Sequence, residues 1–593
     1  MTRHDYNMKR IVLYIGLAAA MMAACDPKKD EILPPVTDYT SFKASLEQPT
    51  ETRVYADKNL HLHWSAEDRV SIFGGTTRNQ LFQFTGKTGD DAGVFNKVVT
   101  EDAGTANPIP HAVSVYPYRK NTAISSGEVL TVNLPAVQPY VPDTFAPEAN
   151  TMVAVSKDNN LLYKNVGGFL VFQLYGYEAS VASITLKGNN NEHIAGEATV
   201  TMPLDGVPAV KMTLDATSQI TLACETPVKL GLTEEECVPF WFAIPPMSFS
   251  KGFTIVVHDY LGGTFEYSTS QSITIDRNKL TRMPPMEVTI HVTFEDKKFK
   301  GMCVSEFDLD GDNEISVREA RKATALDLSE TGIGSLYGLQ YFWNLTSLKC
   351  SSNRLTSLDV SYCKALRTLW CYNNRLTALD LSNNPLLTDL QCSDNRLTSL
   401  DVRHITGLKT LYCHFNELTS LDVSKQSVLE DLLCEYNQLT ELDLGNTSSL
   451  VHLYCFHNQL TRLDVGNHKQ LVELICEENQ LTSLDVSNNL ALEGLSCDKN
   501  QLTSLDVSHN PELWDLGCSN TLLTSLDVSA NKNLKNLSCA NTRLTLLDVS
   551  NNPLLEELYC VHNPTLTEIW LKTGQTIQEL EYDTDVATLM YKP

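Results

Sequence analysis

Residues 387–402 read Leu-Thr-Asp-Leu-Gln-Cys-Ser-Asp-Asn-Arg-Leu-Thr-Ser-Leu-Asp-Val, and close variants of this unit recur through the second half of the chain. The cysteine of the unit returns every 21 residues, at positions 350, 371, 392, 413, 434, 455, 476, 497, 518, 539 and 560. A fixed period of this length indicates a repeat architecture, because one unit can bury its apolar side chains only against its neighbours. We therefore predict a solenoid over residues 324–570, with residues 571–593 as its C-terminal cap.

The unit, Leu-x-x-Leu-x-Cys-x-x-Asn-x-Leu-Thr-x-Leu-Asp-Val-Ser, resembles the leucine-rich repeat, with cysteine in the last leucine position of the strand. The resemblance implies one short parallel strand per turn, so eleven turns about 4.8 Å apart would span about 50 Å. The asparagine three residues after each cysteine, such as Asn353, is expected to satisfy backbone groups at the turn. Thr521 and Thr542 replace this asparagine, and we expect local irregularity there.

Two further ladders follow from the same period. A cysteine ladder could hold metals or disulfides, but eleven is an odd number and the register faces each thiol inward, so we predict buried free thiols. Cys363 lies off this ladder, and we expect it to be exposed. Aspartates recur from Asp359 to Asp548, and repulsion between them requires hydrogen bonds or cations. We expect bonds from backbone or hydroxyl groups at the turn, with bridging cations as the alternative.

The strands of such a solenoid line its concave face, and outward positions on this face carry rings. These rings are Trp370, Tyr372, Tyr412, His414, Tyr454, Phe456 and Tyr559, with Phe415 and Tyr436 one residue further along. Acids share the face, at Asp389, Asp431, Glu435, Glu473, Glu477 and Asp498. Outward rings have no packing role in their own domain, so they indicate a binding site for a protein or a glycan, and the acids favour a basic protein. The alternative is that a long array exposes some rings without any role.

A segment before the repeats, residues 308–319, resembles the calcium-binding loop of EF-hand proteins. The resemblance implies one structural Ca²⁺ ion with ligands from Asp308, Asp310, Asp312, the backbone carbonyl of Glu314, Ser316 and a bidentate Glu319. The sixth loop position, normally glycine, is Asn313, which tolerates the left-handed conformation needed there. We assign residues 296–323 to this loop and an N-terminal cap. The alternative is a polar loop that opens a short helix over residues 317–323.

Residues 40–292 show period-two alternation in short pieces such as residues 253–257, with turn residues between them. Many short strands of this kind predict an all-β region of tandem β-sandwiches. Residues 62–70, 165–172 and 242–246 resemble segments of fimbrillin-like proteins. This resemblance implies a pilus subunit or an anchor or accessory lipoprotein. We favour a stalk that carries the repeats, because a large second module follows.

The N-terminus carries targeting features. Lys9 and Arg10 precede an apolar run over residues 11–22, which indicates a secretory signal peptide over residues 1–24. The Ala-Ala-Cys ending resembles the lipobox of bacterial lipoproteins and implies lipidation of Cys25, with residues 25–39 as a tether. Residues 29–31 resemble the surface-export signal of Bacteroidetes lipoproteins, which implies an outer-membrane protein that faces the cell exterior. The alternative is a secreted protein with a chance cysteine.

Composition excludes several functions. The net charge of −26, from 46 basic and 72 acidic residues, argues against a nucleic-acid-binding protein. We find no metalloprotease motif, nucleophile elbow or phosphate loop, and therefore predict no enzymatic activity. Two functions remain. One is a surface lipoprotein that binds a protein or glycan through the repeats; the other is a fimbria-associated structural subunit that assembles with fimbrial subunits through its β-domain.

Overall fold

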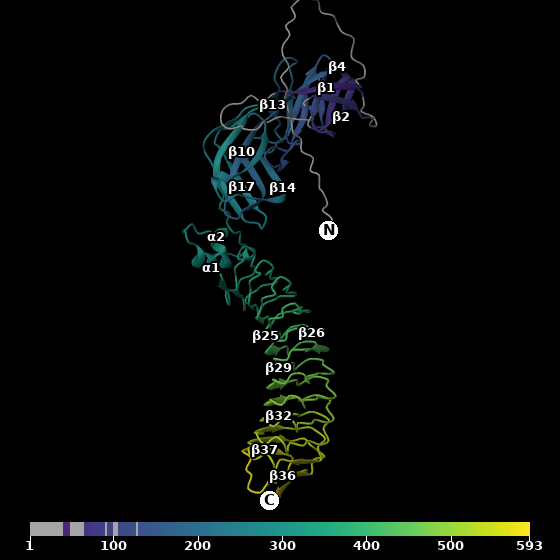
Figure 1. The fold of residues 1–593 in the computed structure, drawn as a ribbon, viewed down its shortest axis with the longest axis vertical. Helices are drawn as coiled ribbons and strands as arrows, with labels where there is room; N and C mark the ends of the chain where they lie inside the picture. The colour runs from purple at the N-terminus through teal and green to yellow at the C-terminus, as the bar shows by residue number, and fades with distance from the viewer. Residues whose placement is uncertain (1–39, 48–63, 89, 91, 99–104, 126–128) are drawn as a thin grey trace, which may run out of the picture. The chain divides into compact units, whose positions relative to one another are not determined.

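The computed structural model describes residues 40–47, 64–88, 90, 92–98, 105–125 and 129–593 (Figure 1). Cys25, the predicted signal peptide and the predicted tether lie outside these residues. The chain forms two compact units, Met1–His291 and Val292–Pro593. Among the described residues, no helix has both the length and the apolar character needed to cross a membrane.

The first unit begins with a barrel, in which six strands close in the order β1-β3-β2-β4-β8-β9. Strand β1 pairs antiparallel with β3 and parallel with β9, and this parallel pair closes the barrel. The interior is filled by rings around Trp64, whose ring meets that of Phe95 edge-on at 4.8 Å. The barrel strands are β1 (Ser41–Leu46), β2 (Arg69–Phe84), β3 (Gly93–Lys97), β4 (Thr105–Tyr116), β8 (Met152–Ser156) and β9 (Asn160–Asn165).

Four smaller sheets complete this unit, in the orders β15-β10-β20, β18-β17-β11-β14-β7, β13-β12-β6-β5 and β16-β19. Phe172, between the first two of these sheets in the buried core, contacts the rings of Phe242 and Phe253. The remaining elements are β5 (Ala123–Ser125), β6 (Val129–Leu134), β7 (Val137–Pro139), β10 (Gly168–Tyr175), β11 (Ser180–Gly188), β12 (Gly196–Thr201), β13 (Ala209–Met212), β14 (Gln219–Lys229), η1 (Glu234–Glu236), β15 (Val238–Ile244), β16 (Met247–Phe249), β17 (Phe253–Asp259), β18 (Thr264–Ser268), β19 (Ile273–Ile275) and β20 (Leu280–Glu287).

The unit is thus almost entirely β, as predicted. Its barrel differs from the open pairs of sheets expected of tandem sandwiches. The alternation of apolar and polar residues predicts which face of a strand is buried but not which strand lies beside it. The parallel pairing of Lys43 with Asn160 could therefore not be predicted from the sequence.

Two short helices precede the repeats in the second unit: α1 (Lys297–Phe307) and α2 (Val317–Ala320). Asp296 caps α1, because its side chain accepts hydrogen bonds from the backbone N–H groups of Lys298 and Phe299. The ring of Phe299 is buried and contacts that of Phe342, just after η2 (Leu339–Tyr341). The helices therefore cover the apolar interior at the start of the solenoid.

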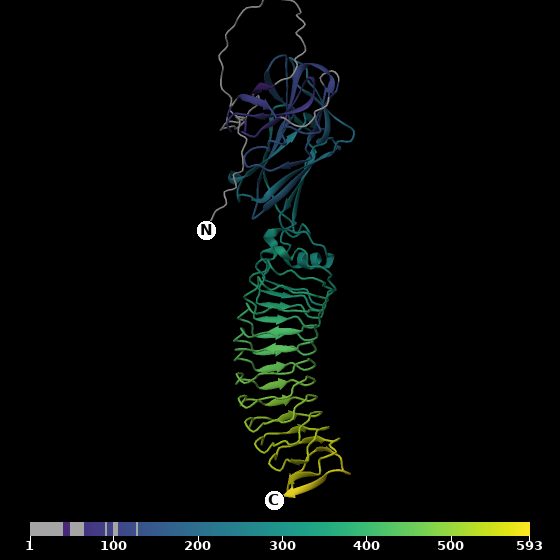
Figure 2. The same cartoon turned by 90° about the vertical axis from the view of Figure 1, so that its right-hand side faces the viewer.

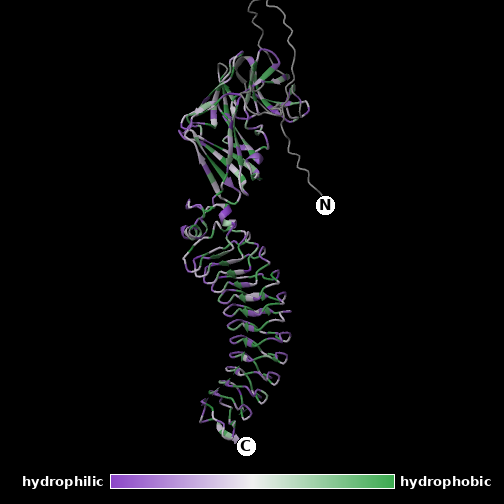
Figure 3. Ribbon diagram, turned by 60° about the vertical axis from the view of Figure 1, so that its left-hand side comes forward, coloured by the Kyte–Doolittle hydropathy of each residue, from purple (hydrophilic) through white to green (hydrophobic). Residues whose placement is uncertain are grey.

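The repeats form one 13-stranded parallel sheet, whose strands lie stacked along the solenoid (Figure 2). Each strand leucine pairs with that of the next turn, as Leu411 does with Leu432, and these leucines are buried. Apolar residues therefore recur on every turn (Figure 3). The strands are β21 (Ala325–Asp327), β22 (Ser347–Lys349), β23 (Thr368–Trp370), β24 (Asp389–Gln391), β25 (Thr410–Tyr412), β27 (Asp431–Leu433), β29 (His452–Tyr454), β30 (Glu473–Ile475), β31 (Gly494–Ser496), β32 (Asp515–Gly517), β33 (Asn536–Ser538), β35 (Glu557–Cys560) and β37 (Glu579–Tyr582).

The opposite side of each turn carries shorter pairings. Strands β26 (Ser420–Asp422) and β28 (Glu441–Asp443) pair there, and β34 (Leu546–Asp548), β36 (Glu568–Lys572) and β38 (Thr588–Lys592) form a second sheet. The solenoid curves gently, with the 13-stranded sheet on its concave side and β26 on its convex side (Figure 1). Because β37 and β38 extend both sheets, regular pairing continues through the residues predicted to form the C-terminal cap.

Asparagines connect successive turns at the end of each strand. The Oδ1 atom of Asn437 accepts a hydrogen bond from the N–H of Leu418 at 3.0 Å, and its Nδ2 donates to the carbonyls of Cys413 and Cys434 at 3.1 Å. At Thr521 only a bond from its hydroxyl to the carbonyl of Cys518 remains of this pattern. The strands nevertheless stay in register there, so the expected irregularity is confined to side-chain hydrogen bonds.

The side chains of the aspartate ladder accept hydrogen bonds from backbone N–H groups, as predicted. The Oδ1 atom of Asp359 accepts a hydrogen bond from the N–H of Ser361, two residues further on, at 2.9 Å. The same bond recurs at Asp380, Asp401, Asp422, Asp443, Asp464, Asp485, Asp506, Asp527 and Asp548. These bonds fix the turn that follows each repeat.

The ladder cysteines are buried free thiols, as predicted, but the expectation for Cys363 is wrong. Cys363 is completely buried, because it opens a second inward column with the same 21-residue period. The next member of this column, Asn384, donates from Nδ2 to the carbonyl of Cys363 at 2.9 Å. The column continues through Ile405, Gln426, Thr447, His468, Asn489, Asn510, Asn531 and Asn552, all of them buried. The residue type at this position changes from turn to turn, so a search for identical residues at a fixed spacing does not find the column.

Candidate binding face of the solenoid

The strand face is defined here as the outward residues of the 13-stranded sheet: those on either side of each strand leucine and the two residues after each cysteine. In the turn of β25 these are Thr410, Tyr412, His414 and Phe415, whereas Leu411 between them is buried. All nine rings that the sequence places on this face lie there, and each is half-buried or exposed. None of them points into the leucine interior.

Three rings on this face form a stack. Phe415 and Tyr436 lie parallel, with ring centroids 4.2 Å apart and planes at 9°, and Tyr436 and His457 follow at 4.2 Å and 20°. All three residues are the second after a cysteine, and their φ angles of 50°, 52° and 51° lie in the left-handed region. Because every turn repeats this strained conformation, side chains at this position leave the backbone in the same direction and align their rings.

Further rings pack on the stack. His414 contacts Phe415 at 5.7 Å and Tyr412 at 6.4 Å, while Phe456 contacts Tyr436 at 5.3 Å. We call Tyr412, His414, Phe415, Tyr436, Phe456 and His457 the ring cluster. Its most accessible members are Phe415, at 46% exposure, and Tyr436, at 37%. Six rings from three successive turns thus form one connected surface.

The other predicted rings lie apart from the cluster. Trp370 stands two turns earlier, where Nζ of Lys349 lies 3.8 Å from the centre of its ring and its Nε1 donates to Asp389 at 2.8 Å. Tyr372 follows it in the same turn and is half-buried. Tyr454 donates its hydroxyl proton to Glu473. These residues belong to the strand face but not to the stack.

His457 is a member of the cluster that the sequence reasoning missed. It occupies the same place in its repeat as Phe415 and Tyr436, two residues after a cysteine. Its Nδ1 lies 2.8 Å from Oε2 of Glu478, the residue in the same place one turn later. Comparison of this position across successive repeats would have found it.

Carboxylates surround the rings and repel one another. Glu435 is 7% exposed, and its burial, with the charge of Asp394, raises its pKa to about 7. Burial also raises the pKa of Asp498 and of Asp515, and neighbouring acids add to both effects. Burial lowers the pKa of His414, whose Nδ1 lies 3.7 Å from Oε1 of Glu435. The strand face therefore carries closely spaced carboxylates, and a bound cation would reduce the repulsion between them.

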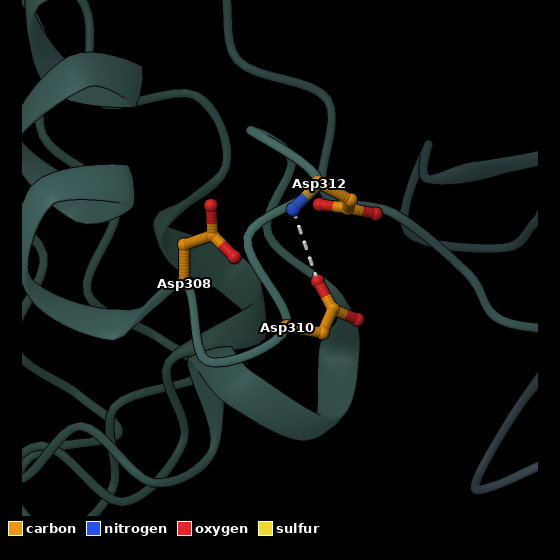
Figure 4. A group of neighbouring side chains, drawn as sticks. All are labelled: Asp308, Asp310 and Asp312. Atoms are coloured by element: carbon orange, nitrogen blue, oxygen red, sulfur yellow. Dashed lines mark hydrogen bonds between the residues drawn. The ribbon is translucent and has the colours of Figure 1, made fainter.

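The predicted calcium loop brings three carboxylates together. One oxygen from each of Asp308, Asp310 and Asp312 lies within 4.8 Å of the others (Figure 4). Backbone N–H groups hold them in place: Gly311 and Asn313 donate to Asp308 at 2.7 and 3.0 Å, and Asp312 donates to Asp310 at 3.2 Å. These oxygens retain further lone pairs, so the donor set suits a hard cation such as Ca²⁺.

The sixth position of the loop has the expected backbone: Asn313 has a φ of 64°, the left-handed conformation that a glycine normally supplies. The carboxylate of the last predicted ligand, Glu319, already accepts hydrogen bonds within the protein. Its Oε1 accepts from the N–H of Leu309, and its Oε2 accepts from the N–H and hydroxyl of Ser316, each at 2.8 Å. The bond from the N–H of Ser316, with the reciprocal bond from the N–H of Glu319 to the hydroxyl of Ser316 at 3.2 Å, forms a capping box for α2. The side chain of Glu314 pairs with Lys300 at 2.5 Å, which leaves its carbonyl as the predicted ligand.

Residues 343–384 match the family model described as leucine-rich repeats (2 copies). No curated protein matches the chain.

Several solved structures are similar to about half of this chain. The functional domain of InlJ from Listeria monocytogenes, which includes a cysteine ladder, is 33% identical, with coverage of 50% of this chain and 70% of that one and a TM-score of 0.46. The internalin inlF of the same organism is 18% identical (coverage 51% and 91%, TM-score 0.43). The leucine-rich effector protein YopM from Yersinia pestis is 26% identical (coverage 51% and 96%, TM-score 0.35). The matched family model and the stacked parallel strands show that the second unit is a leucine-rich-repeat solenoid of about 13 turns.

Proposed function

We propose that the protein is a binding protein rather than an enzyme, and that a partner docks on the strand face of its solenoid. One observation carries the proposal: six rings from three successive turns join into one connected cluster on the strand face, with Phe415 and Tyr436 exposed. Solenoids commonly use such extended concave surfaces for recognition. Exposed aromatic groups with polar neighbours are typical of interaction sites.

A protein is the first candidate for the partner, because leucine-rich repeats are typical of protein-binding domains. A glycan is the second candidate, since the ring of Phe415 at the end of the stack is exposed and its free face suits stacking on a sugar ring. The two candidates differ in what the surrounding carboxylates add. A basic protein surface gains from them, whereas a neutral sugar does not.

A screen of the full chain against arrays of purified cell-surface proteins and of glycans tests this proposal. We expect at least one ligand whose binding falls on substitution of Phe415 and Tyr436 by alanine. The control replaces Tyr362 and Trp514, which are similarly exposed (37% and 41%) but lie off the strand face. A ligand set unaffected by the first pair, or affected equally by the control pair, would rule out the strand face as the docking site.

We further propose that the chain is a lipoprotein anchored at Cys25, with the β-unit as a stalk that presents the solenoid at the outer surface of the cell. The signal-like N-terminus and the lipobox-like residues before Cys25 support this. Metabolic labelling with a fatty acid, followed by protease treatment of intact cells, tests both parts. A chain with Cys25→Ser should lose the label, and an unlabelled wild-type chain or a protected solenoid would contradict the anchor or its orientation, respectively.

The loop of residues 308–319 is proposed to hold one structural Ca²⁺ ion next to the first turn of the solenoid. The convergence of three carboxylates and the left-handed Asn313 support the proposal. An ion there would neutralise the repulsion of Asp308, Asp310 and Asp312 and would fix the segment between α1 and α2.

The second candidate function is a fimbria-associated subunit, supported by the fimbrillin-like segments of the first unit. Its five-stranded sheet ends in the short strand β18, whose outer edge pairs with His291 at Thr264, and the rest of such an edge can pair with a strand from another chain. Assembly of the purified full chain into polymers would support this function. A chain that stays monomeric at high concentration and with purified fimbrial subunits would exclude it.

A further inference from the structure

The second position after each cysteine forms a column along the strand face, and five successive members are Asp394, Phe415, Tyr436, His457 and Glu478. Three stacked rings are thus flanked by a carboxylate at each end. We propose, on the basis of the proposed binding role, that this column binds the arginine side chains of a basic protein segment. Their guanidinium groups lie on the ring stack and pair with the flanking carboxylates.

Charge along the face supports a cationic occupant. From the turn of Trp370 to that of Glu478, all of it described, the strand-face positions hold neither lysine nor arginine. They hold the carboxylates Asp389, Asp394, Asp431, Glu435, Glu473, Glu477 and Glu478. Within this stretch the histidines are the only groups that can become cationic. Asp431 has a histidine partner, and Glu478 has a histidine and Lys499 as partners, but the face as a whole keeps an excess of acids. A partner with several positive charges would therefore relieve the repulsion among them.

The solenoid itself shows how its exposed rings take cations. Nζ of Lys349 lies 3.8 Å from the ring centre of Trp370, and Cζ of Arg321 lies 4.0 Å from that of Trp343. No cation of the described residues covers Phe415 or Tyr436 in this way, although both are exposed. Tyr436 is stacked on both sides, by Phe415 and His457, so the face open to a cation supplied by a partner is that of Phe415 on the side of Asp394.

Geometry favours arginine over lysine and over sugars. A guanidinium group is flat, so it can lie against a ring and still direct its N–H groups sideways to a carboxylate. Glu478 stands at one end of the stack, paired with Nδ1 of His457 at 2.8 Å and with Lys499. Asp394, at the other end, is exposed and bears no cation among the described residues. An ammonium group carries the charge without the flat face, and a neutral sugar has the face without the charge.

Binding of three fluorescent peptides to the full chain, measured by anisotropy at about 0.15 M salt, tests the inference. The first peptide repeats Gly-Ser-Arg, the second has lysine for each arginine, and the third has citrulline, which keeps the shape but lacks the charge. We expect the arginine peptide to bind most tightly, lysine to bind more weakly and citrulline not to bind. Equal binding of the citrulline peptide would overturn the inference.

Two double variants separate the rings from the charge. Replacing Phe415 and Tyr436 by leucine keeps apolar bulk but removes the flat faces, and should weaken the arginine peptide about tenfold. Its control replaces Tyr362 and Trp514 by leucine. D394N/E478Q should weaken binding by a similar factor, and asparagine suits the left-handed backbone of residue 394.

The control for charge is E417Q/E441Q, which removes two exposed acids away from the strand face. If it weakens the arginine peptide as much as D394N/E478Q does, the peptide responds only to net charge and the inference fails. Such a result would not by itself contradict the proposal that a partner docks on the strand face. A ligand from the arrays that needs Phe415 and Tyr436, but is not displaced by the arginine peptide, would keep the binding face and refute only the arginine preference.

Discussion

Oε1 of Glu435 lies 3.7 Å from Nδ1 of His414, and neither this nitrogen nor the other carboxylate oxygen of Glu435, Oε2, has a hydrogen-bond partner among the described residues. Burial acts in opposite directions on the two groups, because it disfavours the charged form of each. It raises the pKa of Glu435 to about 7 and lowers that of His414. Glu435 is therefore mainly neutral under weakly acidic conditions, and burial favours the neutral form of His414 beside it as well.

This relationship predicts a loss of stability between about pH 5 and pH 7. The unfolded chain releases the proton of Glu435 near its ordinary pKa of 4.5, whereas the folded chain keeps it until about 7. The folded state thus binds more protons in this window, and stability falls as pH rises, by up to about 3 kcal/mol from this group. E435Q should lose less stability than the wild type between pH 5 and pH 8, as measured by urea unfolding. Parallel losses in the two proteins would contradict this assignment; His414 acts with the opposite sign and is present in both.

A second prediction concerns the asparagine ladder. N437L removes the bonds to Leu418, Cys413 and Cys434 and leaves these backbone groups buried without partners, which should cost about 2 to 4 kcal/mol. N437T should cost less, because threonine already stands in the ladder at residue 521. Urea unfolding gives the overall change, and hydrogen exchange at the amide of Leu418 reports it locally.

The matched control for this series is N533A, since Asn533 is exposed and its amide donates only long hydrogen bonds, to the carbonyl of Pro511 at 3.3 Å and to the carboxylate of Glu512 at 3.2 Å. We expect a change within about 0.5 kcal/mol. If N437L behaved like N533A, the ladder would add nothing to stability, and the stacking of apolar side chains alone would hold the turns together.

Thiol reactivity provides a third prediction. Burial blocks access to the ladder cysteines and raises their pKa, as at Cys392, where it reaches about 12. Iodoacetamide at pH 8 should therefore label Cys224 and Cys237, which are half-buried, before any ladder position. Mass spectrometry of the native and the urea-unfolded chain measures the difference. Early labelling of Cys363 would contradict its place in the second inward column.

The repeat architecture was predictable because a period of 21 residues fixes both the direction and the burial of each side chain. That logic placed the thiols inside, the aspartates on backbone N–H groups and the rings on the strand face. It gave the recurring position of His457 but not the stacking, because the stacking depends on a φ angle near 50° that no residue type at this position indicates. Serine, asparagine, aspartate, phenylalanine, tyrosine, histidine, glutamate and lysine all occur there.

The β-unit was less predictable for a related reason. Alternation assigned strands to residues 40–292, but it contains no information on pairing across long stretches of chain. The barrel closes through β1 and β9, which are separated by more than a hundred residues. The calcium loop shows the same limit: its spacing gave the positions of Asp308 and Asp310, whereas the capping role of Glu319 emerged only from the contacts.

The double role of Glu319 gives the last prediction. If Ca²⁺ binds, millimolar Ca²⁺ should stabilise the wild-type chain by about 1 to 2 kcal/mol, given the affinity of extracellular loops of this type. D310N/D312N removes two predicted ligands but leaves the bonds of Glu319 to Leu309 and Ser316 intact. This variant should lose the calcium response while keeping its stability in chelator.

E319Q should behave differently, because Glu319 holds α2 even without an ion. It should be less stable than the wild type in chelator, by about 1 kcal/mol for a lost capping bond, and should also respond less to Ca²⁺. Thermal unfolding in chelator, Ca²⁺ and Mg²⁺ measures all three proteins, with E417Q/E441Q as the control for charge. A calcium response that persists in D310N/D312N would place the ion elsewhere, since no loop of this kind can bind Ca²⁺ tightly after losing two of its three clustered carboxylates.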